Sequence, residues 1–310
     1  MDIKQRLIKF NWTPYILLLP WFFGIGIFRV YPMIRSFWYS LHDFHPILQT
    51  MNFIGLGNYR TLFSSAHISD PGFWESLIGH AHFRDSVIAT LRYVLWGTPA
   101  VLIVAFFVAF ILNFKLKGVN LFRTMYYIPS ILGGNVAVAM VWRELFSGNG
   151  PVNAVLRTIG VEPIPWITSA TFAPFTLIFL SAWQFGSVML IFLAALQNVS
   201  PSLYEAASID GARKWRQLFS ITLPIITPVL LFNSVNVLLR HFQEFNAAFL
   251  ITNRGPNRAT DFMNVVIYDF AFLRLQFGLA SAMTWVLLAA IGVFTMILFF
   301  TSKHWVHYSD

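Results

Sequence analysis

Several side chains capable of chemistry lie inside one of the most apolar stretches of the sequence. They follow the spacing i, i+3, i+4, i+7, i+8 and i+11, which places them on one helical face. These positions are Asn233, Asn236, Val237, Arg240, His241 and Glu244. Ionisable groups in a membrane helix are costly and face a cavity or a solute pathway. We therefore predict that this face, with a second helically spaced cluster, lines such a pathway. The second cluster is Trp183, Gln184 and Ser187.

The charged members of this face allow three kinds of chemistry. A guanidinium binds a carboxylate or phosphate bidentately, so Arg240 favours an acidic solute. The stripe of Arg240, His241 and Glu244 is also compatible with proton relay in a secondary transporter. A membrane enzyme would use His241 and Glu244 as acid and base. The structural alternative is that Arg240 pairs with Glu244 one turn away.

The elements that carry these residues are predicted to cross a membrane. Hydrophobic residues make up 57% of the 310-residue chain and charged residues only 11%, against about 25% charged in a soluble domain. A crossing helix needs about 20 mostly apolar residues. Six segments qualify: 12–40, 85–112, 125–146, 171–198, 223–251 and 273–301. We expect an all-α membrane protein with six transmembrane helices in a single domain, 1–310.

The distribution of basic residues predicts the orientation of these helices. With the N-terminus in the cytoplasm, the inner stretches hold Lys4, Arg6, Lys9, Lys115, Lys117, Arg123, Arg213, Lys214, Arg216 and Lys303. The outer loops hold Arg60, Arg84, Arg157, Arg254 and Arg258 beside several acidic residues. Every lysine is on the predicted inner side, as the positive-inside rule requires. Both termini are therefore expected in the cytoplasm, together with residues 199–222.

Residues 199–222, which we call the EAA segment, interrupt the apolar spans with a polar and glycine-containing stretch. Ser200 before Pro201 predicts a helix start, and Ser202 with Glu205 fits a capping box. Gly211 predicts the helix end, because glycine accepts the left-handed conformation. A second helix is predicted from the helical spacing of Trp215, Leu218, Phe219 and Thr222. Such short helices must pack on lipid or in a partner's groove.

One signature within and after this segment resembles a known family. The pattern EAA-x-x-DGA-x6-F-x-I-x-LP-x3-P is formed by Glu205, Ala206, Ala207, Asp210, Gly211, Ala212, Phe219, Ile221, Leu223, Pro224 and Pro228. It resembles the membrane subunits of binding-protein-dependent ABC importers. The stretches "FIGLGNY", "YYIPS" and "FGLASAMTW" resemble the carbohydrate branch, which includes the larger permease subunit of maltose importers. The extra outer domain and the additional N-terminal spans of that subunit have no counterpart here.

The resemblance implies a type I importer permease in the inner membrane, with the EAA segment as its coupling helix. In a sugar permease, Arg240 would favour an acidic substrate such as a uronate oligosaccharide (an alginate fragment, for example) or glycerol phosphate. Coupling residues would be Glu205, Ala206, Ala207, Asp210, Gly211, Ala212, Phe219, Leu223 and Pro224. In this reading Glu205 meets a basic group on an ATPase, the two alanines allow close approach, and Gly211 makes the bend. The implied partners are a second homologous permease chain, two nucleotide-binding ATPase subunits and an extracytoplasmic solute-binding protein. The alternative is an ordinary cytoplasmic helical hairpin.

The sequence lacks the motifs of an enzyme that hydrolyses ATP by itself. It has no G-x-x-x-x-G-K-[ST] phosphate loop, and neither HExxH nor GxSxG occurs. We expect no catalytic residue, no bound cofactor and no metal site in this chain. ATP and Mg²⁺ are expected on the partner ATPase subunits.

Overall fold

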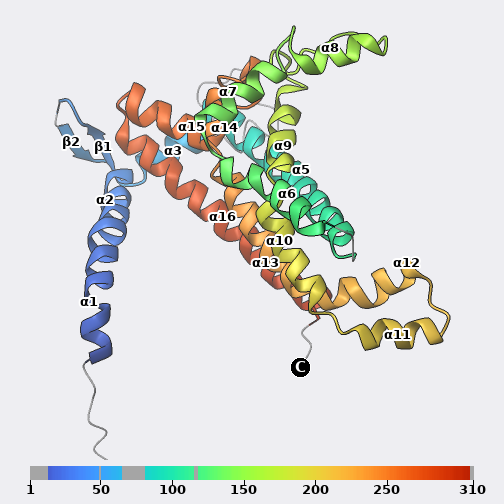
Figure 1. The fold of residues 1–310 in the computed structure, drawn as a ribbon. Helices are drawn as coiled ribbons and strands as arrows, with labels where there is room; N and C mark the ends of the chain where they lie inside the picture. The colour runs from blue at the N-terminus through green and yellow to red at the C-terminus, as the bar shows by residue number, and fades with distance from the viewer. Residues whose placement is uncertain (1–12, 49, 65–80, 115–117, 308–310) are drawn as a thin grey trace, which may run out of the picture.

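The computed structural model describes residues 13–48, 50–64, 81–114 and 118–307, which are helical almost throughout (Figure 1). Lys4, Arg6, Lys9, Lys115 and Lys117, used above to predict orientation, lie outside the described residues. In chain order the elements are α1 (Thr13–Ile25), α2 (Tyr31–Ser40), β1 (His42–His45), β2 (Thr50–Phe53), α3 (Gly57–Phe63), α5 (Ala81–Leu112), α6 (Val119–Leu132), α7 (Val136–Leu145), α8 (Pro151–Thr158), α9 (Ala173–Trp183), α10 (Gly186–Gln197), α11 (Pro201–Ile209), α12 (Lys214–Gln217), α13 (Leu223–Phe242), α14 (Asn246–Leu250), α15 (Met263–Tyr268) and α16 (Phe277–Trp305). π-helical turns join α1 to α2 and α12 to α13.

Four helical stretches in the described part of the chain are long and apolar enough to cross a membrane. They are Thr13–Ser40, His82–Leu112, Lys214–Leu250 and Phe277–Trp305. Two pairs of shorter helices pass the same test jointly: α6 with α7, bent by 103°, and α9 with α10, bent by 47°. These six stretches overlap the six predicted segments, although the third begins at Val119 and the fifth at Lys214, before the predicted residues 125 and 223. The total is six crossings if each bent pair crosses once.

The bend between α6 and α7 has a local cause that the apolar pattern does not reveal. Gly134 has a φ of +79°, in the left-handed region where glycine is favoured. The Asn135 side chain then accepts a hydrogen bond from the backbone N–H of Ala137 at 3.0 Å. This is the geometry of an N-cap, so a new helix starts at Val136 in another direction.

The bend between α9 and α10 depends on a side chain from α6. Ser130 Oγ donates to the Gln184 carbonyl at 3.1 Å and accepts from the Ser187 N–H at 2.9 Å. Both backbone groups are freed by the break, and in a membrane they need an internal partner. A Cβ on Gly186 would lie only 2.5 Å from the Tyr126 carbonyl oxygen, so glycine permits this close helix contact.

The central helix is α5, which packs against α9, α10 and α13. Two fully buried small residues, Ala105 and Ala109, belong to the same core cluster as Ile226 and Val237 of α13. Small side chains at a helix interface allow the backbones to approach closely, which favours packing between membrane helices.

The predicted outer loop around "FIGLGNY" covers helix ends. The Asn58 side chain donates to the carbonyls of Ser40 and His42, both at 2.9 Å. Leu62 is fully buried, and a Cβ on Gly278 would lie 2.1 Å from the His42 carbonyl oxygen. This segment therefore joins the end of α2 to the start of α16.

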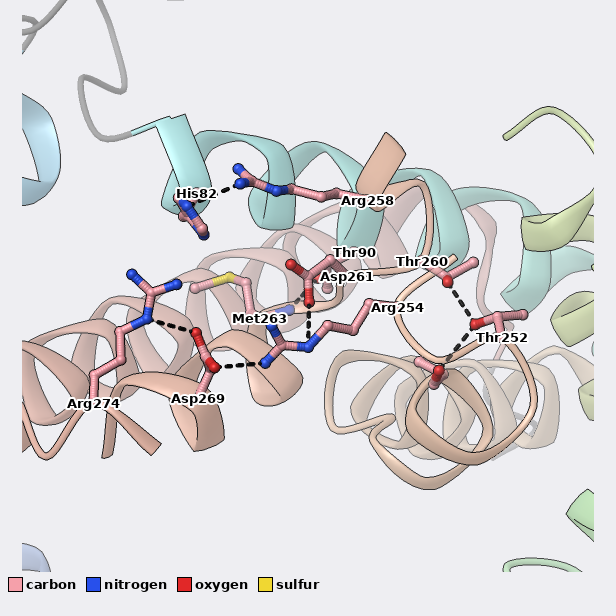
Figure 2. A network of polar contacts seen from close by, with 11 residues as sticks. His82, Thr90, Thr252, Arg254, Arg258, Thr260, Asp261, Met263, Asp269 and Arg274 are labelled. Carbon is pink, nitrogen blue, oxygen red and sulfur yellow. Dashed lines mark hydrogen bonds and ion pairs between the residues drawn. The ribbon is translucent and has the colours of Figure 1, made fainter. Parts of the chain in front are cut away.

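A network of ion pairs holds the loop between α14 and α15 (Figure 2). Arg254 lies 2.9 Å from Asp269 and 3.7 Å from Asp261, and Arg274 lies 2.8 Å from Asp269. Arg254 has a φ of +74° and Asn257 of +50°, which is strained backbone for residues other than glycine. The ion pairs hold this strained loop against both ends of α15, because Asp261 precedes that helix and Asp269 follows it.

The pKa values of the two buried aspartates of this network are shifted in opposite directions. Burial raises the pKa of Asp261 to about 6, although Arg254 and Arg258 act against this shift. Burial also acts to raise the pKa of Asp269, but its contacts with Arg254 and Arg274 outweigh that effect and lower it. Ionised Asp269 therefore stabilises the folded state above its unfolded pKa, and this contribution is lost as the pH falls through its folded pKa. The contribution of Asp261 is present at low pH and is lost as the pH rises through about 6.

We expect Asp269→Asn to lower the thermal midpoint near neutral pH and Asp261→Asn to raise it. The first change leaves arginines of the network without their carboxylate, at a cost of about 1–3 kcal/mol. The second removes a buried charge that the fold disfavours above about pH 6. The midpoints should be measured in lipid nanodiscs across the pH range, with wild type as the reference. The two variants should differ most at high pH and converge toward acidic pH; equal midpoints at neutral pH would contradict this assignment.

Candidate functional site

A cavity of about 90 Å³ lies between α5, α7, α9, α13 and α14. Five of the nine predicted pathway residues line it: Gln184, Val237, Arg240, His241 and Glu244. They come from the two clusters singled out in the sequence, one at the bend after α9 and one along α13. The structure therefore brings Gln184 of the smaller cluster together with four residues of the larger one around one space.

Four predicted pathway residues lie outside this lining: Trp183, Ser187, Asn233 and Asn236. Asn233 is 1% exposed, and neither atom of its amide group has a hydrogen-bond partner in the described structure. Asn236 is exposed and donates to the backbone carbonyl one turn earlier at 2.8 Å. The helical face identified from the sequence is thus broader than the face that borders the cavity.

His241 is fixed at the wall of the cavity by side chains of two other helices. Its Nδ1 lies 2.9 Å from Thr98 Oγ1 of α5, and its Nε2 lies 2.6 Å from Ser181 Oγ of α9. The ring packs edge-on against Tyr93 at 4.8 Å between centroids. A Cβ on Gly97 would lie 3.1 Å from the imidazole. With both ring nitrogens engaged, His241 joins α5 and α9 to α13.

Arg240 and Glu244 do not form the ion pair that was considered in the sequence analysis. No contact within 4.0 Å joins their charged groups in the described structure, so the structural-pair alternative is wrong. Glu244 instead accepts a hydrogen bond from the backbone N–H of Ala247 at 2.9 Å, at the start of α14. Arg240 is exposed where it borders the cavity. Its guanidinium is therefore available to an anionic group in that space.

Sequence reasoning missed several polar residues of the cavity, including Tyr93, Asn135 and Ser181. Arg240 was selected because it is a polar group inside an apolar span. The same criterion applies to Ser181 and to Thr98, which both contact His241. Their partners, however, lie on other helices. A single-helix periodicity cannot identify such contacts.

The EAA segment folds as a helix, a glycine turn and a second helix, as predicted. The first helix, α11, starts at Pro201 after Ser200 and is followed by Gly211 with a φ of +74°. No side chain caps its start, so the predicted capping box from Ser202 to Glu205 does not form. Gln217 of α12 joins the two helices by donating to Ser208 Oγ of α11 at 3.0 Å.

The surface of the EAA segment carries unusually exposed apolar side chains. Ile209 is 87% exposed, Trp215 70% and Phe219 62%. Among the predicted coupling residues, Glu205, Ala206, Asp210, Gly211 and Phe219 are exposed, and Ala207, Ala212, Leu223 and Pro224 are partly buried. A shallow groove of about 220 Å³ runs beside them, lined by Ala207, Asp210 and Arg216 among others. Exposed apolar side chains beside such a groove are typical of a protein interface.

The EAA segment and the cavity belong to one continuous element. The helical stretch Lys214–Phe242, formed by α12, a π-helical turn and α13, begins within the EAA segment. Its C-terminal part carries Val237, Arg240 and His241. A displacement at its exposed start would therefore move residues that border the cavity.

Comparison with known families identifies the chain. Residues 76–307 match the family described as binding-protein-dependent transport system inner membrane component. The chain belongs to this family. The permease is 41% identical to the probable ABC transporter permease protein YesP of Bacillus subtilis (strain 168), over 100% of this chain and 96% of YesP. It is 31% identical to the lactose transport system permease protein LacF of Rhizobium radiobacter, covering 90% of each chain. It is also 31% identical to the sn-glycerol-3-phosphate transport system permease protein UgpA of Shigella flexneri, covering 96% of this chain and 97% of UgpA.

The fold agrees with a solved importer. The permease aligns with a chain of a bacterial alginate ABC transporter, solved in complex with its alginate pentasaccharide-bound periplasmic protein, with a TM-score of 0.74. The alignment covers 96% of each chain at 22% identity, so the likeness is one of fold. The resemblance to sugar-importer permeases is thus confirmed, and the chain is a translocating, non-catalytic subunit of an inner-membrane ABC importer.

Proposed function

We propose that this permease forms one half of a heterodimeric pore that carries an acidic saccharide from an extracytoplasmic binding protein into the cytoplasm. Two ATPase subunits would bind the EAA segment and drive the transport cycle. The observation that carries the proposal is the continuous helical stretch Lys214–Phe242, formed by α12, a π-helical turn and α13. It connects an exposed, partner-like surface with residues that border the cavity, so movement of a bound ATPase would reach the solute pathway directly.

Arg240 supports the acidic substrate class. Its guanidinium borders the cavity without an ion pair in the described structure, and such a group binds carboxylates and phosphates bidentately. Two of the similar proteins are named for acidic substrates, alginate and sn-glycerol 3-phosphate, and one for neutral lactose. We favour a uronate oligosaccharide such as an alginate fragment, because the cavity region also offers aromatic and amide side chains that suit sugar rings.

The first helix supports a second permease chain. No residue of α1 is buried, and only its continuation α2 packs on α16. Figure 1 shows α1 standing apart from the bundle. A homologous chain packing against this helix, together with surrounding lipid, would cover its apolar surface.

The arrangement of the ends supports the predicted orientation. The start of α1 and the end of α16 lie at the same end of the molecule as α11 and α12 (Figure 1). The His307 N–H donates to Thr227 Oγ1 at 2.9 Å, which holds residue 307 near the start of α13. We infer that this end, with the EAA segment and both termini, faces the cytoplasm.

The test is uptake by the complete complex in proteoliposomes, with its ATPase subunits and binding protein. Lactose, an alginate trisaccharide and sn-glycerol 3-phosphate serve as labelled probes. We expect ATP-dependent uptake and substrate-stimulated ATP hydrolysis, strongest for the trisaccharide, and no loss of uptake when the proton gradient is collapsed. Uptake that stops on collapse of the gradient while ATP remains would overturn the proposal in favour of proton coupling through Arg240, His241 and Glu244.

A further inference from the structure

Aromatic rings form a chain of contacts from the cavity region toward the end of the molecule opposite the EAA segment. Trp183 lies 5.6 Å from Trp142, which lies 5.0 Å from Phe146, between ring centroids. Phe146 in turn lies 5.7 Å from Trp166. Phe172 and Phe179 flank Trp166 at 5.7 Å and 6.2 Å. We call these rings the aromatic ladder: Trp183, Trp142, Phe146, Trp166, Phe172 and Phe179.

Hydrogen bonds hold two indole rings of the ladder in fixed orientations. Trp142 Nε1 donates to the Thr176 carbonyl at 3.1 Å, and Trp166 Nε1 donates to Asn153 Oδ1 at 3.2 Å. Asn153 is fully buried. Since the polar edges of both rings are occupied, the rings contribute apolar surface in a preorganised position.

The ladder adjoins the cavity along the chain at one end, and two of its inner rings line a second hollow. At one end, Trp183 immediately precedes the cavity residue Gln184, and Trp142 lies one turn beyond Val138, which also lines the cavity. Farther along the ladder lies a hollow of about 230 Å³, lined by Phe146 and Trp166 among others. This volume is several times the roughly 30 Å³ that a water molecule occupies in the liquid, so a ring-sized group fits.

The rim of this outer hollow offers groups for hydroxyl recognition. Arg143, Glu144 and Ser147 border it together with the two aromatic rings. A pyranose ring has an apolar face of C–H groups and a rim of hydroxyls. Aromatic surface would cover the face, and the carboxylate, the guanidinium and the serine hydroxyl would bind the rim.

We propose that the aromatic ladder is a binding track for sugar rings, leading from the outer hollow to the cavity. The inference rests on the proposed saccharide import and adds the route by which the sugar is loaded. A ring would stack at Trp166 and Phe146 and then pass Trp142 and Trp183 to reach Arg240. Stacking on the track requires a ring-shaped solute, so the track does not strengthen binding of sn-glycerol 3-phosphate.

The competing occupant is lipid. Trp side chains are enriched at membrane interfaces, where they anchor helices irrespective of substrate. Phe179 and Trp183 are 45% and 38% exposed, so bilayer contact is the alternative for these rings. If the ladder binds sugar, replacing one ring changes the KM for uptake of the sugar. If the ladder only contacts lipid, the same replacement changes the thermal stability of the protein and leaves KM as it was.

The test compares Trp166→Leu, Trp166→Phe and the control Trp96→Leu in the complete complex. Trp96 is 66% exposed on α5 and lies outside the ladder. For uptake of an alginate trisaccharide, we expect Trp166→Leu to raise KM by about tenfold, Trp166→Phe much less, and Trp96→Leu not at all. The KM for sn-glycerol 3-phosphate, where it is transported, should not change in any variant.

Three outcomes distinguish a sugar track from a lipid anchor and from failure of the proposed function. A KM for the trisaccharide that rises only in Trp166→Leu supports the track. Unchanged KM values in all variants, with equal losses of thermal stability in the two leucine variants, would overturn it in favour of lipid anchoring while import itself stands. If the wild-type complex takes up no saccharide at all, the proposed function fails, and the track fails with it.

Discussion

Gly211→Pro is expected to reduce ATP hydrolysis by the assembled complex to its unstimulated rate, even with substrate-loaded binding protein present. Gly211 has a φ of +74°, whereas proline fixes φ near −65°. Proline also removes the hydrogen bond from the Gly211 N–H to the Ser208 carbonyl at 3.1 Å. An incompatible proline costs about 3 kcal/mol or more, which is enough to displace α11 from its position beside α12. The exposed surface would then no longer match a partner's groove.

The matched control is Gly118→Pro. Gly118 has a φ of +76° and, like Gly211, has no other group within 4 Å of an added Cβ. It precedes α6 and lies outside the EAA segment. Equal loss of stimulation in both variants would mean that backbone strain disturbs the protein in general, and coupling through the EAA segment would be withdrawn. Gly211→Ala should fall between wild type and proline, since a left-handed conformation costs an L-residue roughly 1–2 kcal/mol.

Charge reversal at Glu205 tests the same surface without changing the backbone. Glu205 is exposed, and no hydrogen bond or ion pair of its side chain is seen among the described residues. Glu205→Arg should therefore leave the thermal midpoint unchanged while weakening assembly with the ATPase. Glu162→Arg, an exposed carboxylate in the predicted outer loop, serves as the control. Normal assembly of the Glu205 variant would remove this residue from the interface.

Arg240→Gln is expected to reduce uptake of an alginate trisaccharide by about 30-fold or more and to leave lactose uptake, where present, nearly unchanged. A hydrogen bond to a charged group contributes about 1.5–3 kcal/mol, and each 1.4 kcal/mol is a factor of ten. Arg240→Lys should be intermediate, because an ammonium keeps the charge and loses the planar fork. The measurement is initial uptake rate against substrate concentration for each probe.

Arg92→Gln provides the control for Arg240. Arg92 is also an exposed arginine within an apolar helix, α5, and it does not line the cavity. If Arg240→Gln transported the trisaccharide as well as wild type, the acidic-substrate class would be wrong while ATP-driven import stood. If both arginine variants lost uptake equally, the effect would be one of folding or insertion.

The sequence alone determined the features that depend on short segments of chain. Apolar stretches of about 20 residues identify spans regardless of what surrounds them, because a membrane helix must satisfy its backbone within the segment. The helix, turn and helix of the EAA segment follow from Pro201, Gly211 and local spacing. The signature from Glu205 to Pro228 likewise identified the family, since its spacing is a property of one contiguous stretch.

Only the tertiary structure decided how these elements meet. The bend after α9 depends on Ser130, 54 residues from Gln184 along the chain. Thr98 lies 143 residues before His241, yet the two side chains are in contact. Helical periodicity gives the polar face of α13 but not its rotation against α5 and α9, so it could not distinguish Arg240 at the cavity from Asn233 in the packed interior. That rotation is set by close packing between helices distant in sequence, such as the contact of His241 with Gly97, and no local pattern encodes it.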